Sequence, residues 1–209
     1  AQAKLAVPLS PRDKLTATVI GALDDIGFNN TDLDNRLDNA RVIGLNQQQY
    51  IAGLVYTHSG DRSLVTLAAG RTFTRFRADQ TDTLGAEVFR SRAAEGEQSL
   101  RAEWKGEVGR SVLATIGATA KYADRLQYEA SLPGFLRRDA SGVEQPLSRD
   151  TSFTGFRIGT YAELAWNVSP RLTLTTGARL DRYAYLAGPW RAAPRVAASL
   201  ELSPGTSLT

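Results

Sequence analysis

Cysteine and methionine are both absent from this sequence of 209 residues, and histidine occurs once, as His58. Without cysteine, the chain can form neither a disulfide framework nor a cysteine-ligated metal site. No stretch approaches the roughly 18 consecutive apolar residues of a membrane-spanning helix. The chain also begins without methionine or a signal peptide, so we interpret it as a segment whose targeting information lies upstream.

A strong charge of either sign is lacking as well. The net charge is only +3, with 22% charged and 42% hydrophobic residues. The basic excess is small and scattered, so a nucleic-acid partner is not expected. This composition suits a soluble β domain and an outer-membrane barrel equally, because barrel strands alternate and never accumulate a long apolar run.

The sequence does contain a strict alternation of apolar and polar residues, which is clearest between positions 156 and 183. From Phe156 to Val168 every second residue is apolar or small, and the pattern resumes from Leu172 to Tyr183 after Ser169-Pro170-Arg171. Successive strand side chains point to opposite faces, so each stretch has one apolar and one polar face. Proline has no N–H to donate, so the chain turns at Pro170. The pattern predicts a hairpin of two long strands.

The length of this hairpin favours a membrane barrel. Strands of soluble proteins usually run to about 5–6 residues, whereas a tilted membrane strand needs roughly 9–11. Trp166 lies next to the turn on the apolar face, where an interfacial aromatic girdle would place it. A large soluble sandwich with one wet face remains an alternative for this hairpin taken alone.

The rest of the chain repeats the pattern, with connections that alternate between short and long. Short turns are predicted at 10–13, 59–61, 107–109, 169–170 and 203–205, and long loops at 29–46, 78–97, 124–153 and 186–193. In an antiparallel meander this puts every short turn at one end, as in bacterial outer-membrane barrels. We therefore predict an all-β fold, an antiparallel up-and-down meander of about nine to ten strands. Residues 1–209 would form a single segment of a large transmembrane β-barrel.

The facing of the strands follows from the same alternation. The segments 47–58 and 62–77 leave open which side meets lipid. The first and last strands should be unpaired edges of an open sheet. On the other strands, ten apolar residues are expected on the lipid side: Leu100, Trp104, Phe156, Ile158, Leu164, Trp166, Leu172, Leu174, Val196 and Leu200.

No catalytic or metal site is predicted, and no cofactor is expected. The run from Asn29 to Asp38 distantly resembles a calcium loop, but Leu37 stands where an EF-hand requires glycine, so a solvated loop is expected. His58, Ser59 and Asp61 include the residue types of a catalytic triad. Adjacent strand side chains point apart, which opposes a triad here.

The strands also carry a family resemblance. The segments TYAELAWNVSPRLTLTTGARLDRY and APRVAASLELSPGTSL resemble barrel strands of the TonB-dependent outer-membrane transporters. The ending G-x-R-x-D-x-Y recurs in that family and is present here from Gly177 to Tyr183. The start KLAVPLSPRDKLTATV is similar in style, so the resemblance spans most of the chain.

The resemblance implies active uptake of a scarce, bulky nutrient, such as a ferric siderophore, across the bacterial outer membrane. Members have a 22-stranded barrel, an N-terminal plug and a box that contacts the TonB energy-coupling protein. The plug, the box and the remaining strands are not in this segment. The expected partners are outer-membrane lipid, TonB through the missing region, and a small-molecule or metal-chelate ligand. A passive porin-like channel is the alternative.

Candidates for ligand contact come from the predicted long loops and from the polar, lumen-side face. Arginine forks can bind carboxylates of a chelate, and aromatic rings can cover its apolar parts. The alternative is that the charged lumen residues form cross-strand ion pairs or contact the plug. The loop candidates are Tyr128, Phe135, Arg137, Arg138, Trp190 and Arg191, and the lumen-side candidates are Arg157, Tyr161, Glu163, Arg179, Asp181 and Tyr183.

Overall fold

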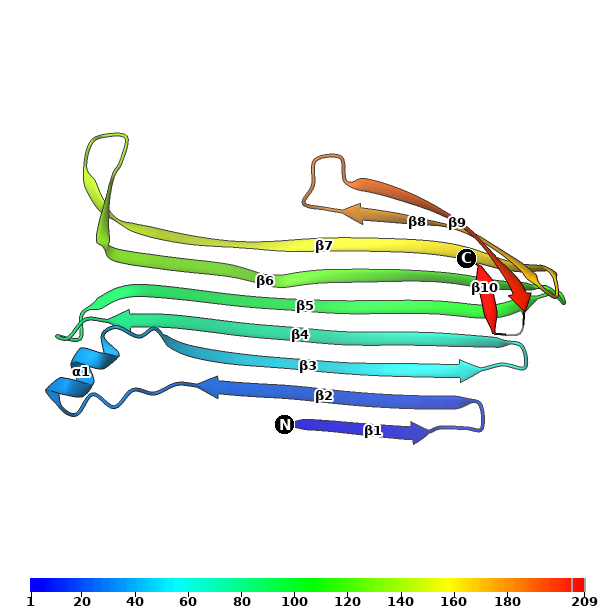
Figure 1. Cartoon of the computed structure of the whole chain (residues 1–209), viewed down its shortest axis with the longest axis horizontal. Coiled ribbons are helices and arrows are strands. Elements are labelled where there is room, and N and C mark those ends of the chain that lie inside the picture. Colours follow the sequence, from blue (N-terminus) through cyan, green and yellow to red (C-terminus); the bar gives the residue numbers. More distant parts are fainter. Residues whose placement is uncertain (204, 209) are drawn as a thin grey trace.

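A computed structural model describes residues 1–203 and 205–208, which form one antiparallel sheet with its strands in sequence order (Figure 1). This confirms the predicted up-and-down meander. All described strands belong to this sheet, so no second sheet packs on it and the sandwich alternative is excluded. The elements are β1 (Gln2–Pro8), β2 (Asp13–Asp25), α1 (Leu33–Asn39), β3 (Gly44–Ser59), β4 (Ser63–Thr81), β5 (Glu87–Val108), β6 (Val112–Arg138), β7 (Glu144–Ser169), β8 (Leu172–Tyr183), β9 (Trp190–Ser203) and β10 (Thr206–Leu208).

The short turns gather at one end of the sheet, as predicted, on the right in Figure 1. The turn between β7 and β8 shows why the sequence turns there. The Ser169 hydroxyl oxygen accepts hydrogen bonds from the backbone N–H groups of Arg171 (3.3 Å) and Leu172 (3.1 Å). Pro170 has no N–H that would need a partner. The last predicted turn includes Pro204, and the last strand Thr209, which lie outside the described residues.

The sheet is open. Its strand order starts at β1 and ends at β10, and the residues described show no pairing between these two strands. This agrees with the expectation that the first and last strands are unpaired edges. An unpaired edge exposes backbone N–H and C=O groups, which in lipid cost several kcal/mol each. In a membrane, these two edges would be costly unless other strands paired with them.

Two predicted long loops are wrong. Residues 87–97 belong to β5 and residues 124–138 to β6, while β7 begins at Glu144, so the connections shorten to 82–86 and 139–143. In these extensions both faces carry polar residues, which removes the alternation that identifies a strand in sequence. The strands continue nonetheless, because backbone hydrogen bonds to the neighbouring strand do not depend on side-chain polarity.

The connection from β2 to β3 is long, as predicted, and contains the short helix α1. Asp32 caps this helix: its Oδ1 accepts a hydrogen bond from the Asn35 N–H (2.8 Å). The Asp32 carboxylate thus satisfies a free helical N–H, which is a common role for aspartate before a helix. Nowhere in the described residues is a helix long and apolar enough to span a membrane.

The register gives the sheet one apolar and one polar face. Directly paired residues share a face, and Trp104, Ile116 and Ala162 form one continuous row. The same register resolves β3 and β4, placing Leu54 and Leu67 on the apolar face. Seven of the ten apolar side chains predicted to face lipid are exposed, and Trp104, Ile158 and Leu172 are half-buried. Only small side chains form buried apolar contacts, at Ala78, Ala94 and Ala114, so the apolar face requires an external apolar covering.

Aromatic side chains mark both limits of this apolar face. Tyr56, Trp104 and Trp166 lie near the short turns, and Tyr50, Phe73, Tyr122 and Phe156 lie toward the opposite end. On β6 the band between these rows runs from Val112 to Tyr122, about ten residue steps or roughly 33 Å of strand. At a tilt of roughly 40° it is about 25 Å high, the height of the apolar band of outer-membrane barrels.

Candidate functional site on the polar face

The polar face is organised around a contact that spans three strands. Glu103 of β5 is paired with Gly117 of β6, which is paired with Tyr161 of β7. The Tyr161 ring lies over Gly117, and its hydroxyl donates a hydrogen bond to the Glu103 carboxylate. A Cβ at Gly117 would collide with the ring. The glycine therefore allows the tyrosine to reach a strand that is not its neighbour.

Arginines extend this contact on both sides. Arg101 Nη2 donates to Glu103 Oε2 (2.6 Å) and lies 3.4 Å from the Tyr161 hydroxyl. Arg179 on β8 lies over the Tyr161 ring, with its Cζ 6.0 Å from the ring centre. Arg179 also binds both oxygens of Asp181, at 2.7 and 2.8 Å. We name these five side chains, Arg101, Glu103, Tyr161, Arg179 and Asp181, the lumen cluster.

Two ion pairs flank the lumen cluster on the same face. Lys121 binds Glu97 at 2.6 Å, and Arg195 lies 3.4 Å from Glu163. A groove of about 580 Å³ follows the cluster, lined by Arg101, Glu103, Tyr161, Glu163, Arg179 and Arg195 among others. Arginine forks and a tyrosine hydroxyl in such a groove can bind planar anionic groups such as carboxylates.

The six predicted lumen-side residues do share one face. Glu163 pairs with Arg195 of β9, which is a cross-strand ion pair of the kind considered as the alternative role, whereas Arg179 and Asp181 pair with each other along the same strand, β8. Arg157 has no carboxylate hydrogen bond within the described residues and instead lies over the Tyr183 ring, 5.7 Å from its centre. Of the two predicted lumen-side arginines, Arg157 and Arg179, Arg157 is thus the one without a carboxylate hydrogen bond among the described residues.

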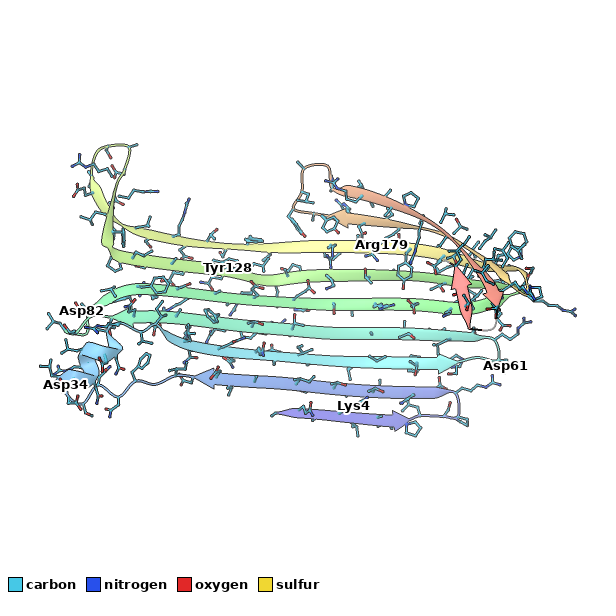
Figure 2. The ribbon with its side chains drawn as sticks, viewed as in Figure 1. Lys4, Asp34, Asp61, Asp82, Tyr128 and Arg179 are labelled. Carbon is cyan, nitrogen blue, oxygen red and sulfur yellow. The ribbon has the colours of Figure 1, made fainter. Side chains whose placement is uncertain are left out.

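The six predicted loop residues are on strands instead. Tyr128 is on the polar face of β6, where its hydroxyl bonds to Glu95, and it lies far along the strands from Arg179 (Figure 2). Phe135, Arg137 and Arg138 occupy the end of β6, where Arg138 is 3.1 Å from Glu144. None of these four residues lies beside the lumen cluster, because the strand carries them away from it.

Trp190 and Arg191 also lie on a strand, at the start of β9. Trp190 is paired with Arg182, whose Cζ lies 5.7 Å from the indole ring, on the apolar face. Arg191 donates to the carbonyl oxygens of Gly188 (2.6 Å) and Trp190 (2.9 Å). Trp190 thus faces away from the lumen cluster.

The candidate list from the sequence missed Arg101, Glu103, Glu97 and Lys121. The alternation between Gln98 and Gly106 already indicated that Arg101 and Glu103 share the polar face. It did not indicate which residues of other strands lie opposite, since register between distant strands depends on the whole sheet.

His58 lies at a strand end, and it contacts Asp13. The two side chains are 2.7 Å apart, and the Asp13 carboxylate also accepts from the Tyr56 hydroxyl at 2.6 Å. No metal-binding group of three or more His, Cys, Asp or Glu side chains occurs in residues 1–203 or 205–208.

Residues 7–209 match a protein family described as TonB dependent receptor-like, beta-barrel. The chain belongs to this family. The TonB-dependent receptor-like β-barrels lie in the bacterial outer membrane and are receptors and transporters rather than enzymes. In a membrane barrel the apolar face of each strand meets lipid and the polar face lines the lumen. No curated protein sequence matches the chain closely enough to be counted as a relative.

Solved structures show the same fold at low identity. The siderophore receptor PirA from Acinetobacter baumannii matches with 13% identity and a TM-score of 0.65, covering 97% of this chain and 31% of PirA. The ferric preacinetobactin receptor BauA from the same organism matches with 13% identity and a TM-score of 0.59, covering 99% and 38%. The outer membrane transporter YddB from Escherichia coli matches with 12% identity and a TM-score of 0.57, covering 96% and 29%. The chain thus spans about a third of the length of these proteins.

Proposed function

We propose that this segment is part of the barrel wall of a receptor that imports a bulky, anionic metal chelate of the ferric-siderophore kind. Import would be driven by TonB, acting through a region outside this chain. The proposal is supported by membership of the TonB-dependent receptor-like barrels and by siderophore receptors among the proteins of similar fold. The observation that carries it is the row of arginine and tyrosine side chains on the lumen face.

The lumen residues divide into two roles by their partners. Arg179 and Asp181 form an ion pair with each other, and Glu163 forms one with Arg195. We therefore assign Glu163, Arg179 and Asp181 to stabilising the barrel wall. Arg157 is free of a carboxylate hydrogen bond among the described residues and is half-buried beside Tyr183. Arg137 is exposed near the 139–143 turn and forms no ion pair within the described residues. We assign Arg157 and Arg137 to ligand contact, with Arg137 at the entrance and Arg157 deeper in the lumen.

The test uses the full-length receptor in cells that lack other uptake routes for the chelate. Arg157→Gln and Arg137→Gln should each weaken binding of a ferric catecholate probe about tenfold, since a charge-assisted hydrogen bond contributes roughly 1.5 kcal/mol or more. The matched control is Arg110→Gln at the short-turn end, which should bind normally. Unchanged binding in both test variants would show that neither Arg157 nor Arg137 contacts the ligand.

A second measurement separates active transport from passive flow. Uptake of the bound chelate should stop when TonB is inactivated, although binding to the receptor persists. If the chelate enters equally well without TonB, and the purified protein conducts ions steadily in a planar bilayer, the porin-like alternative is correct instead.

A further inference from the structure

At the end of the sheet opposite the short turns, the wall drops in height between β7 and β8. Strand β7 starts at Glu144, but its pairing with β8 starts only at Arg157, which faces Tyr183. Within the described residues, the strand partners of 144–156 therefore lie on β6 alone. Figure 1 shows this step, with β7 continuing far past the tip of the β8–β9 hairpin. The upper part of β7 is thus an open strand edge.

Alternate residues of this edge direct their backbone groups away from β6. The Phe156 carbonyl oxygen accepts a hydrogen bond from the Ala184 N–H at 2.9 Å, so the backbone of Phe156 points toward the β8 side. Successive residues of a strand alternate in this direction. Four even-numbered residues therefore direct their N–H and C=O groups to the side that β8 does not reach: Ser148, Asp150, Ser152 and Thr154. Over about 25 Å these groups form a template for one more strand.

A proline protects only the upper end of this edge. Exposed strand edges are commonly protected by proline, which has no N–H to offer an added strand. Pro146 has this effect next to the 139–143 turn. Residues 148–155 contain no proline, so this part of the edge can still pair.

Two apolar side chains of the edge are uncovered on the lumen side. Phe153 is 51% exposed and Leu147 is 36% exposed, although Phe153 has Leu126 as its partner on β6. The even-numbered residues named above point to the outer side and are all polar. An added strand with apolar residues on its lumen side would cover Phe153 and Leu147 by cross-strand contacts.

Two opposite charges on the edge lack partners as well. Arg149 on the lumen side and Asp150 on the outer side form no ion pair among the residues described. On β6, Asp150 faces Glu129, a like charge that binds Arg90 at 2.9 Å. A strand on the open side would neutralise both charges if it placed a carboxylate beside Arg149 and a cation beside Asp150.

We propose that the open edge of β7 pairs with an extended segment of the same receptor, the one that follows β10 in the full-length polypeptide. Each strand from β7 to β10 is antiparallel to the next, so β10 is also antiparallel to β7. The polypeptide after β10 thus runs in the direction that antiparallel pairing with β7 requires. The line of β10 is two strand spacings, or about 10 Å, from the vacant position above β8.

The lengths of similar receptors support an occupant from the same polypeptide. This chain covers 31% of PirA and 38% of BauA, so most of each protein lies outside the matched part. Two receptors in one membrane have the same orientation, so the β7 edges of two copies would run parallel, and parallel pairing is less stable per residue. The pairing would complete the wall where β8 and β9 stop short. This inference does not depend on which nutrient the receptor imports.

Amide hydrogen exchange of the purified, monomeric full-length receptor tests the pairing residue by residue. The amides at 148, 150, 152 and 154 should exchange about a hundredfold more slowly than amides of an unstructured peptide. The amides at 149, 151 and 153 point toward β6 and should be protected in either case, so they are the internal control. Exchange of the four edge amides at the unstructured rate would overturn the proposal.

Ser152→Pro removes one edge N–H and leaves the hydrogen bonds to β6 in place, because the Ser152 N–H points away from β6. Protection at 148, 150 and 154 should fall about tenfold or more, while 149 and 151 stay protected. Ser152→Ala is the matched control, since it keeps the N–H and should keep the protection. Both variants must show the heat-modifiable mobility of a folded barrel. Unchanged protection in folded Ser152→Pro would contradict strand pairing at this edge.

A photo-crosslinking phenylalanine analogue in place of Ser152 identifies the occupant. After illumination of the purified receptor, peptide mapping should find the adduct in the same polypeptide, C-terminal to residue 209. Adducts confined to residues 1–209 would overturn the proposal. A covalent receptor dimer would assign the edge to a second copy, and an adduct with another protein, found only in intact cells, would assign it to an external partner. Either result would overturn the proposed occupant.

Discussion

Tyr161 on β7 and Glu103 on β5 are hydrogen-bonded across an intervening strand, because Gly117 on β6 leaves room for the tyrosine ring. This contact ties three consecutive strands together through side chains on the lumen face. Backbone ladders join only neighbouring strands, so the contact restricts how far the three strands can move relative to one another.

Removing the Tyr161 hydroxyl tests this contact. Tyr161→Phe keeps the ring and deletes the donor to a charged carboxylate, so unfolding in urea should become easier by about 1.5–3 kcal/mol. Tyr122→Phe is the matched control, because this exposed tyrosine has no hydrogen-bond partner within the described residues. It should change stability by less than about 0.5 kcal/mol. Equal effects of the two substitutions would show that the Tyr161–Glu103 bond adds no stability.

The space above Gly117 gives a second test on the same row. Gly117→Ala places a Cβ where the Tyr161 ring lies, so we expect destabilisation of about 1–3 kcal/mol from overpacking. Gly53→Ala is the control: its Cβ meets only the Ala69 carbonyl oxygen, at an ordinary 3.6 Å. Alanine there should be neutral or stabilising by about 0.5–1 kcal/mol. A neutral Gly117→Ala would mean that the ring has an equally good alternative position.

Removing Arg179 and removing Asp181 should lower the free energy of unfolding by different amounts. The Asp181 side chain is 13% exposed, whereas that of Arg179 is 44% exposed. Arg179→Gln leaves a largely covered carboxylate without its cation and should cost about 1–3 kcal/mol. Asp181→Asn leaves an arginine that water can reach, and should cost less than about 1 kcal/mol. Urea unfolding of both proteins measures the difference, and the reverse order would contradict the burial argument.

Charge on the lipid side should be costly at mid-height. Ile116 lies near the middle of the apolar band and is 56% exposed in the isolated sheet. Ile116→Arg should destabilise the receptor in lipid vesicles by about 2–4 kcal/mol. Thr115→Arg, one residue away on the lumen face and paired with Glu163, should cost far less. If the two variants are equally stable, the assignment of faces on β6 is wrong.

Acid should loosen the hairpin tip between β6 and β7. Asp139 Oδ1 accepts from the Ser141 hydroxyl (2.8 Å) and from the N–H groups of Ser141 (2.9 Å) and Val143 (3.0 Å). These bonds, led by the Ser141 hydroxyl, lower the pKa of Asp139. Because the folded pKa is depressed, the stabilisation is present above the unfolded value near 4 and disappears as pH falls through the folded pKa.

Pepsin cleavage within 139–143 reports this loosening. The unaltered receptor should be cleaved faster at pH 2 than at pH 4, relative to Asp139→Asn, which carries no titrating group at this position. A cleavage ratio between the two proteins that stays constant with pH would rule out control of the tip by Asp139.

The sequence predicted the part of the fold that lies in the membrane. There, lipid on one side and the lumen on the other impose alternation, which is visible from Phe156 to Val168 and from Leu100 to Trp104. Beyond Tyr122 water reaches both faces, the alternation ends, and the continuation of β6 to Arg138 left no signal. The short helix α1 was also missed, although Asp32 is a typical capping residue.

The candidate site was predicted in part for a related reason. Alternation places Arg157, Tyr161, Glu163 and Arg179 on one face, and the register confirms that they share it. It does not reveal that Tyr161 reaches Glu103, since that depends on the size of a residue on a third strand, Gly117. Contacts across several strands need the full register, which one strand's pattern does not contain.

The length of β6 and β7 has a consequence for what approaches the cell. From Tyr122 to Arg138, β6 continues for about 16 residues, or roughly 50 Å of strand, and the tip of the β6–β7 hairpin bends away from the line of the other strands (Figure 1). An antibody or a bacteriophage tail would meet this hydrogen-bonded hairpin before it reached the membrane. An epitope tag or a fluorophore inserted at 139–143 would therefore be accessible from outside the cell.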